Sequence, residues 1–314
     1  MRFVLTRIGH SLIVLLGVTV VVFAIVHLVP GDPVRIAMGT RFDPDTYDAL
    51  RERAGLDRPL VEQYFSYVGR AVTGDLGVSF RSGQPVTQIL AERLPATVSL
   101  AGVGIVIALL VSIPLGVWTA THHGSVSDSI TRAVSQLGVS LPNFFLATLL
   151  ILLFSTQLGW LPPSGYTSIT EDPVDWLSHV IMPAVTVGVV AGAILTRYVR
   201  SSVLEVLAMD HVRTAESKGL RRSTILSWHV LRNAMVPVVT IVGTQVAAIL
   251  GGVIVVEFVF AWPGLGYLVY DAVEARDYPV VQGAVLLIAT FFLVVNLLVD
   301  LAYAAIDPRI AEGA

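Results

Sequence analysis

The stretch HVRTAESKGLRRSTILSWHVLRNAMVP, residues 211–237, lies between two of the most apolar segments of the chain. It contains Lys218, the only lysine of the protein. Residues 203–219 and 223–232 have the pattern of two helices, and Gly219 would end the first one with Lys218 in its last turn. If the apolar segments on both sides cross a membrane, this basic stretch is the loop that connects them at the membrane surface.

The composition predicts an all-α integral membrane protein. Of 314 residues, 54% are hydrophobic and only 14% are charged, whereas soluble domains carry about 25% charged residues. An α-helix needs about 20 apolar residues to cross a bilayer and satisfies its own backbone hydrogen bonds there. Six transmembrane helices are expected, at residues 11–29, 97–121, 133–158, 177–198, 235–258 and 280–306.

The positive charges predict the orientation, because lysine and arginine concentrate in short cytoplasmic loops. Seven of them lie between residues 197 and 232, in the loop between the fourth and fifth spans and at the end of the fourth span. The loop at 159–176 has none and the loop at 259–279 has one, Arg276, so both are expected outside. An even number of spans then places both termini in the cytoplasm, in agreement with Arg2 and Arg7.

Three parts of the chain are expected. Residues 1–30 are an N-terminal signal-anchor helix, uncleaved because HLVPGDP at its end offers no small-x-small cleavage site. Residues 31–95 are an extracytoplasmic loop subdomain, partly helical around 45–72. Residues 96–307 are a five-helix core whose cytoplasmic loop covers about 201–234.

Small residues predict close helix packing. Gly243, Ala247 and Gly251 are spaced by four in the fifth span, and Gly188 and Gly192 in the fourth. This spacing lets helix backbones approach in lipid. The contact is either within this chain or with a second membrane subunit, and the sequence leaves both open.

A few polar residues lie within the spans, where they usually face a bundle interior or a water-filled cavity. They are either candidates for a translocation path or polar contacts between helices: Gln136, Ser140, Asn143, Gln245 and Asn296. Glu257 and Asp300 are candidates for gating or interface contacts. For Glu257 the alternative is an interfacial anion beside Trp262.

The chain lacks the motifs that would let it drive transport itself, by ATP hydrolysis or by ion coupling. Lys218 is followed by Gly219, so no Gly-Lys-Ser/Thr phosphate-binding loop surrounds it. Buried ionisable residues typical of ion-coupled transport are scarce, no nucleophile is paired with a base, and adjacent His122 and His123 lack a third metal ligand. The basic stretch is therefore either a docking helix for a partner that supplies energy or a loop on anionic lipid head groups.

RTAESKGL at 213–220, followed by LRNAMVP at 231–237, resembles the cytoplasmic EAA loop of ABC importer permeases of the dipeptide/oligopeptide type. Further pieces occur in the family's order: LVPGDP at 28–33, GDLGVSF at 74–80, LGWLPPSGY at 158–166, VVEFVFAWPGLG at 255–266, DYPVVQG at 277–283 and DPR at 307–309. The resemblance runs from end to end and is to the first permease of the pair.

The resemblance implies a type I ABC importer permease fold, no catalysis by this chain, and localisation in a bacterial inner membrane. It implies a second permease, two cytoplasmic ATPase subunits that use ATP and magnesium, and an extracytoplasmic solute-binding protein. Arg213, Thr214 and Ala215 take the Glu-Ala-Ala positions, so the first two depart from that motif, and Gly219 takes the glycine. The coupling segment would comprise these four with Glu216 and Lys218.

Peptides are the expected substrate, and nickel, glutathione or haem are alternatives within the same class of importers. A stand-alone secondary transporter or channel is the distant alternative, which predicts function without an ATPase. A polytopic membrane enzyme is a third. No cofactor is expected on this chain.

Overall fold

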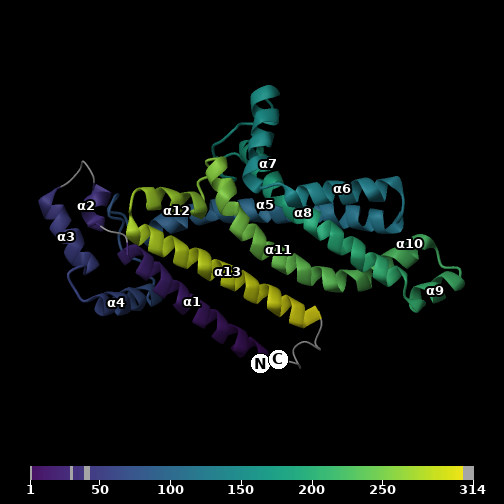
Figure 1. Cartoon of the computed structure of the whole chain (residues 1–314), viewed down its shortest axis with the longest axis horizontal. Coiled ribbons are helices and arrows are strands. Elements are labelled where there is room, and N and C mark those ends of the chain that lie inside the picture. Colours follow the sequence, from purple (N-terminus) through teal and green to yellow (C-terminus); the bar gives the residue numbers. More distant parts are fainter. Residues whose placement is uncertain (1, 29–30, 39–42, 307–314) are drawn as a thin grey trace. The chain divides into compact units, whose positions relative to one another are not determined.

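The computed structural model of the chain describes residues 2–28, 31–38 and 43–306, and the regular structure within these ranges is helical (Figure 1). The helices are α1 (Arg2–Leu28), α2 (Pro33–Met38), α3 (Pro44–Ala54), α4 (Leu60–Val72), α5 (Val86–Thr121), α6 (Val126–Ser140), α7 (Asn143–Leu150), α8 (Pro173–Leu207), α9 (Asp210–Ser217), α10 (Arg222–Thr224), α11 (Arg232–Val259), α12 (Leu265–Glu274) and α13 (Tyr278–Ile306). Two π-helical turns, η2 (Ile151–Gln157) and η3 (Ile225–Leu231), continue α7 and lead into α11.

Within the described residues, five helical stretches are long and apolar enough to cross a membrane, and a bent pair of helices brings the count to six. This confirms the all-helical membrane fold. Several spans begin or end outside the predicted ranges: α1 begins at Arg2, α5 begins at Val86, and α8 runs from Pro173 to Leu207. The additional helical turns contain polar residues, and a prediction from apolar runs alone stops before them.

The predicted third span is not one helix. It consists of α6 and the α7–η2 segment, which meet at an angle of 106°. Leu141 adopts an extended conformation, with φ −82° and ψ 125°. Pro142 follows it and disfavours helical geometry at the preceding residue, so the helix stops there.

A second expected helix, residues 203–219, is also interrupted. α8 ends at Leu207 and α9 begins at Asp210, after Met209 in an extended conformation. The side chains of Val203, Val206 and Val212 are nevertheless all buried in one cluster. The expected single helix is therefore two helices, and its apolar positions do not reveal the turn between them.

The chain divides into two compact units. The first comprises residues 1–97 and 263–294, and the second comprises residues 98–262 and 295–314. The predicted division into three parts, with boundaries at residues 30 and 95, stays a prediction. It divides the chain by membrane topology, whereas the two compact units are defined by contacts between residues.

The first unit combines α1 and the loop helices with α12 and the beginning of α13. Its core includes Val86, Leu90, Leu265 and Leu268. The buried carboxylate of Asp277 accepts hydrogen bonds from the Ser79 hydroxyl and, at 3.0 Å, from the Phe80 amide. Residues 79–80 of GDLGVSF are thereby held against the start of DYPVVQG.

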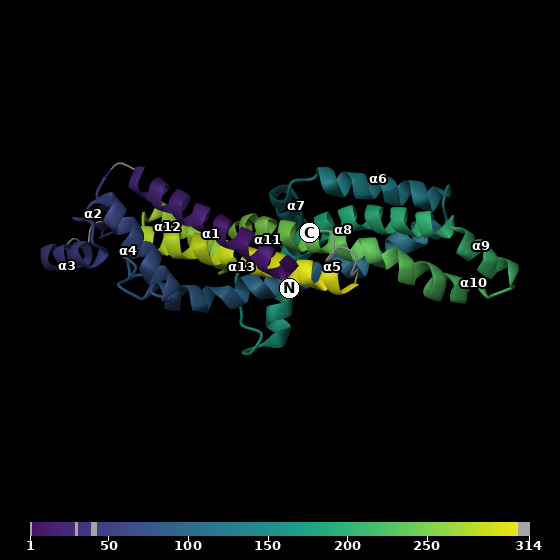
Figure 2. The ribbon, with the colours of Figure 1, turned by 90° about the horizontal axis from the view of Figure 1, so that it is seen from below.

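The second unit is built around α8, which packs against α6, α7 and α11. Figures 1 and 2 both show α6 beside α8 and α9 beyond the end of α8. Glycines make the close approaches: a Cβ on Gly188 would lie 2.8 Å from the Gly104 carbonyl oxygen. A Cβ on Gly243 would lie 2.0 Å from Cγ1 of Val299. These predicted small residues thus serve packing within the chain.

Candidate functional site

The helix α9 is attached to the second unit by one face. Val212 and Ala215, three residues apart, are 1% and 4% exposed. They belong to a cluster that also contains Val203 of α8, Ile225 of η3 and other residues of these helices and α11. Since residues three apart share a helix face, α9 presents its other face to the outside.

The outward face of α9 is charged and polar. Arg213, Thr214, Glu216 and Lys218 are exposed. The Arg213 guanidinium lies 3.7 Å from the Asp210 carboxylate, and both side chains are more than two-thirds exposed. Such a pair contributes little to stability, so these charges remain available for a partner.

The end of α9 depends on glycine. Gly219 has φ +72°, and its amide donates to the Glu216 carbonyl at 2.9 Å. A Cβ at Gly219 would have open space within 4 Å, so its requirement is the left-handed backbone and not close packing. The prediction that Gly219 ends the helix is confirmed.

Among the predicted coupling residues, five are exposed: Arg213, Thr214, Glu216, Lys218 and Gly219. Ala215 is buried and anchors the helix. Their role in coupling stays a prediction.

An ion-pair cluster at the start of α6, which sequence reasoning missed, fixes α8 near its end. The fully buried carboxylate of Asp128 accepts two hydrogen bonds from Arg200 of α8, at 2.8 and 3.0 Å. Arg132 lies 3.6 Å from the same carboxylate, and the Gly124 amide donates to it at 3.1 Å. Asp128 and Arg200 are 72 positions apart, so no local pattern reveals the pair.

The path candidates are spread over several helices of the second unit. Ser140 donates to the Gln136 carbonyl at 2.9 Å, and both side chains are exposed on α6. Asn143, at the start of α7, approaches α11, where its Nδ2 would lie 2.9 Å from a Cβ on Gly252. Gln245 of α11 is two turns from Gly252 and therefore on the same face. Asn296 is half-buried on α13.

Among the residues that the structure describes, no hydrogen bond joins Asn143, Gln245 and Asn296 to one another. Their assignment to a path stays a prediction. The same holds for Asp300, which is half-buried on α13.

Glu257 is buried, and this corrects its alternative interpretation. Both Glu257 and Trp262 are 0% exposed, and the Trp262 amide donates to the Glu257 carbonyl at 2.8 Å. Glu257 is therefore not an exposed interfacial anion. The indole of Trp262 meets the ring of Tyr166 edge-on, at 4.8 Å between centroids, so the turn that follows α11 belongs to the packed core.

Two family models match the chain. Residues 112–312 match the binding-protein-dependent transport system inner membrane component, and residues 1–101 match the N-terminal part of such a component. The chain is 40% identical to the dipeptide transport system permease protein DppB of Escherichia coli K12, over 99% of this chain and 98% of that protein. It is 41% identical to the glutathione transport system permease protein GsiC of the same strain, over 99% of both.

A solved structure supports the fold. The crystal structure of an amino acid ABC transporter with histidines matches with a TM-score of 0.52, covering 71% of this chain and 94% of that chain. Sequence identity is 14%, so this likeness concerns the fold alone.

Proposed function

The chain belongs to the family of binding-protein-dependent transport system inner membrane components, and from this premise we propose that it imports peptides as one permease of an ATP-driven pair. It is a multi-pass membrane permease subunit of an ABC importer. The partners would be a second permease, two ATPase subunits and an extracytoplasmic solute-binding protein. ATP and magnesium would bind the ATPases, and this chain would perform no catalysis.

Short peptides are the proposed substrate class because a relative that matches the whole chain is named for dipeptides. Glutathione is the second candidate, supported by 41% identity to a glutathione permease. Glutathione is itself a tripeptide, so both substrates combine peptide amides with charged ends. A path for either would need hydrogen-bonding groups, and Asn143, Gln245 and Asn296 are the proposed ones.

The observation that carries the proposal is the attachment of α9. One face is buried through Val212 and Ala215, the opposite face is exposed, and Gly219 ends the helix. In the proposed orientation α9 faces the cytoplasm and would seat in a cleft of an ATPase subunit. Because α9 packs against the end of α8, a movement of α9 would be passed to a membrane-crossing helix.

The test is affinity purification of the tagged chain in mild detergent, followed by identification of its partners and by uptake assays in liposomes. We expect a second permease and an ATPase pair to be recovered, and uptake of dipeptides to require internal ATP. An ATPase variant that binds but does not hydrolyse ATP is the control. A chain that is recovered alone and transports without ATP would contradict the proposal and support a secondary transporter or channel.

A further inference from the structure

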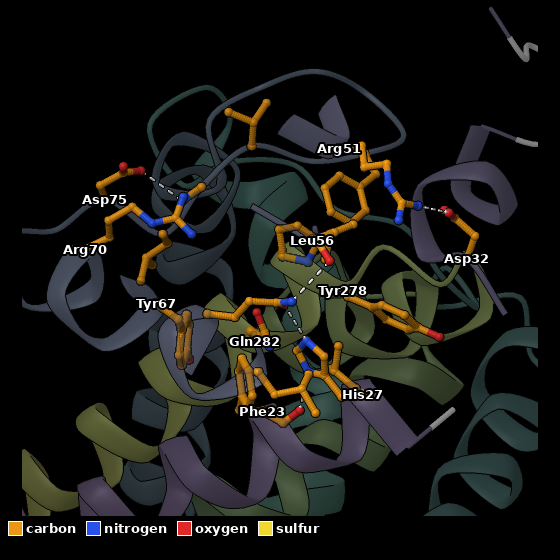
Figure 3. Close-up of a pocket in the computed structure, with 18 of the residues that line it drawn as sticks. Phe23, His27, Asp32, Arg51, Leu56, Tyr67, Arg70, Asp75, Tyr278 and Gln282 are labelled. Atoms are coloured by element: carbon orange, nitrogen blue, oxygen red, sulfur yellow. Dashed lines mark hydrogen bonds and ion pairs between the residues drawn. The ribbon is translucent and has the colours of Figure 1, made fainter. Parts of the chain in front are cut away.

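The first unit contains a polar cavity of about 550 Å³ (Figure 3). Its walls come from the end of α1, from α4, from residues 75–80 and from the start of α13. Figure 3 shows Arg70 and Asp75 on one side of the cavity and Arg51 with Asp32 on the other. The cavity therefore lies where two membrane-crossing helices, α1 and α13, end or begin.

Some polar side chains of the cavity wall already form hydrogen bonds or ion pairs within the protein. Nε2 of His27 lies 3.0 Å from Oε1 of Gln63, whose amide group donates to the carbonyls of Leu56 and Arg58. On the other side Arg51 and Asp32 form an ion pair of 2.6 Å. These groups shape the cavity but have their own partners.

Two donors of α4 on this wall have no hydrogen-bond partner in the part of the chain that the structure describes. The side chain of Tyr67 is 8% exposed, and its hydroxyl has no hydrogen-bond partner among the described residues. The buried Nε of Arg70 has none there either. Leaving a buried polar group without a hydrogen-bond partner is destabilising. Burial raises the pKa of Tyr67 to about 12, so its hydroxyl remains a donor at neutral pH. Both donors are suited to an oxyanion.

The same wall also offers a carboxylate. Asp75 is exposed and lies beside Arg70 in Figure 3. Its Oδ1 accepts a hydrogen bond from the Gly77 amide at 2.9 Å. A ligand that matches this wall carries an anionic group for Arg70 and Tyr67 and a cationic group for Asp75.

An apolar groove meets this cavity. It has a volume of about 500 Å³ and is lined by valine, isoleucine and glycine residues of α1, from Val14 to Val26, and by Val281 and Val285 of α13. Val26 lines both the groove and the polar cavity. Val14 and Val26 are about 18 Å apart along a helix with a rise of 1.5 Å per residue, slightly more than half of a hydrocarbon core of about 30 Å.

We propose that the cavity and the groove together bind one phospholipid with a phosphoethanolamine headgroup. Its phosphate contacts Tyr67 and Arg70, its ammonium contacts Asp75, and one acyl chain lies in the groove between α1 and α13. A short peptide matches only the polar half and leaves the groove empty. The site is separate from the transported substrate and does not depend on its identity.

The headgroup is tested with the complete importer purified in mild detergent, by extraction and mass spectrometry of the lipids that remain bound. We expect Arg70→Gln and Tyr67→Phe each to lower retained phosphatidylethanolamine at least about tenfold. Arg58→Gln is the matched control, because Arg58 is exposed, forms an ion pair with Glu62 and lies outside the cavity wall. Equal retention in Arg70→Gln and Arg58→Gln would overturn the proposal.

Misfolding is separated from lost binding by Tyr67→Phe, because the Tyr67 hydroxyl has no partner among the described residues and its removal leaves their hydrogen bonds intact. The acyl chain is tested by Gly17→Leu, which fills the groove without touching the polar cavity. Gly9→Leu, on the same helix but outside the groove, is its control. Gly17→Leu should lose the lipid and Gly9→Leu should keep it.

Added lipids test the headgroup's chemistry. Phosphatidylethanolamine should raise the melting temperature of the lipid-depleted importer, and phosphatidylglycerol, which lacks the ammonium, should raise it less. An equal effect of both lipids would contradict the role of Asp75. Displacement of the bound lipid by a dipeptide would identify the cavity as a peptide site and overturn the lipid assignment.

Discussion

At the residue scale, Gly219 is important for its backbone conformation. A residue with a Cβ in the left-handed region costs about 1–2 kcal/mol, which shifts a local equilibrium about 5- to 30-fold. We therefore expect Gly219→Val to uncouple ATP hydrolysis from uptake and to lower uptake by about that factor, measured in liposomes with the partner subunits. Gly219→Asn should be milder, because asparagine tolerates this region better.

Gly83 provides a matched control, since it has the same φ of +72° and the same open space around a Cβ. Gly83→Val carries the same backbone cost but lies in the first unit, whereas α9 belongs to the second. Uptake that falls equally in Gly83→Val and Gly219→Val would indicate general destabilisation and contradict a specific role of the α9 terminus.

Asp128 is a second single-residue determinant, because its buried carboxylate pairs with Arg200. Removing one partner of a buried ion pair leaves the other charge uncompensated and costs about 3 kcal/mol. We expect Asp128→Ala to lower the thermal stability of the purified subunit markedly. Asp210→Ala removes an exposed partner of Arg213 and should change stability little. Similar melting temperatures for the two variants would contradict the importance of the α6–α8 ion pair.

At the element scale, the break between α6 and α7 has a local cause. Pro142 restricts Leu141 to an extended conformation, and the axes turn by 106°. In lipid a continuous helix satisfies more backbone groups than a broken one. We expect Pro142→Ala to straighten this segment partly, so that spin labels at positions 129 and 148 move apart and their distance distribution broadens.

The absence of cysteine from the natural sequence allows labels to be introduced at these two positions alone. Pro114→Ala is the control, because α5 remains continuous through Pro114 and its replacement leaves α6 and α7 unaffected. An unchanged distance in Pro142→Ala would mean that packing against α8 and α11 sets the bend.

At the scale of the whole molecule, the sequence predicted features that depend on local composition and missed those that depend on distant pairs. Apolar length predicted the spans, and Gly219 was recognised because glycine alone favours its backbone conformation. The Asp128–Arg200 pair and the Asp277 contacts with residues 79–80 join positions far apart in the chain. The burial of Glu257 likewise follows from tertiary packing. The position of this charged residue at the end of an apolar run does not predict that it is buried.

The outward face of α11 should contact the second permease. Gly243 is buried against Val299, whereas Ala248 and Gly251 are exposed, and a Cβ on Gly251 has open space within 4 Å. Exposed small residues allow another helix to approach closely. We expect Gly251→Leu to reduce recovery of the second permease with the tagged chain at least several-fold while the chain itself still folds. Gly243→Leu should instead lower the chain's own yield, because the new side chain collides with Val299. Undiminished recovery with Gly251→Leu would show that lipid covers this face and that the permeases pair elsewhere.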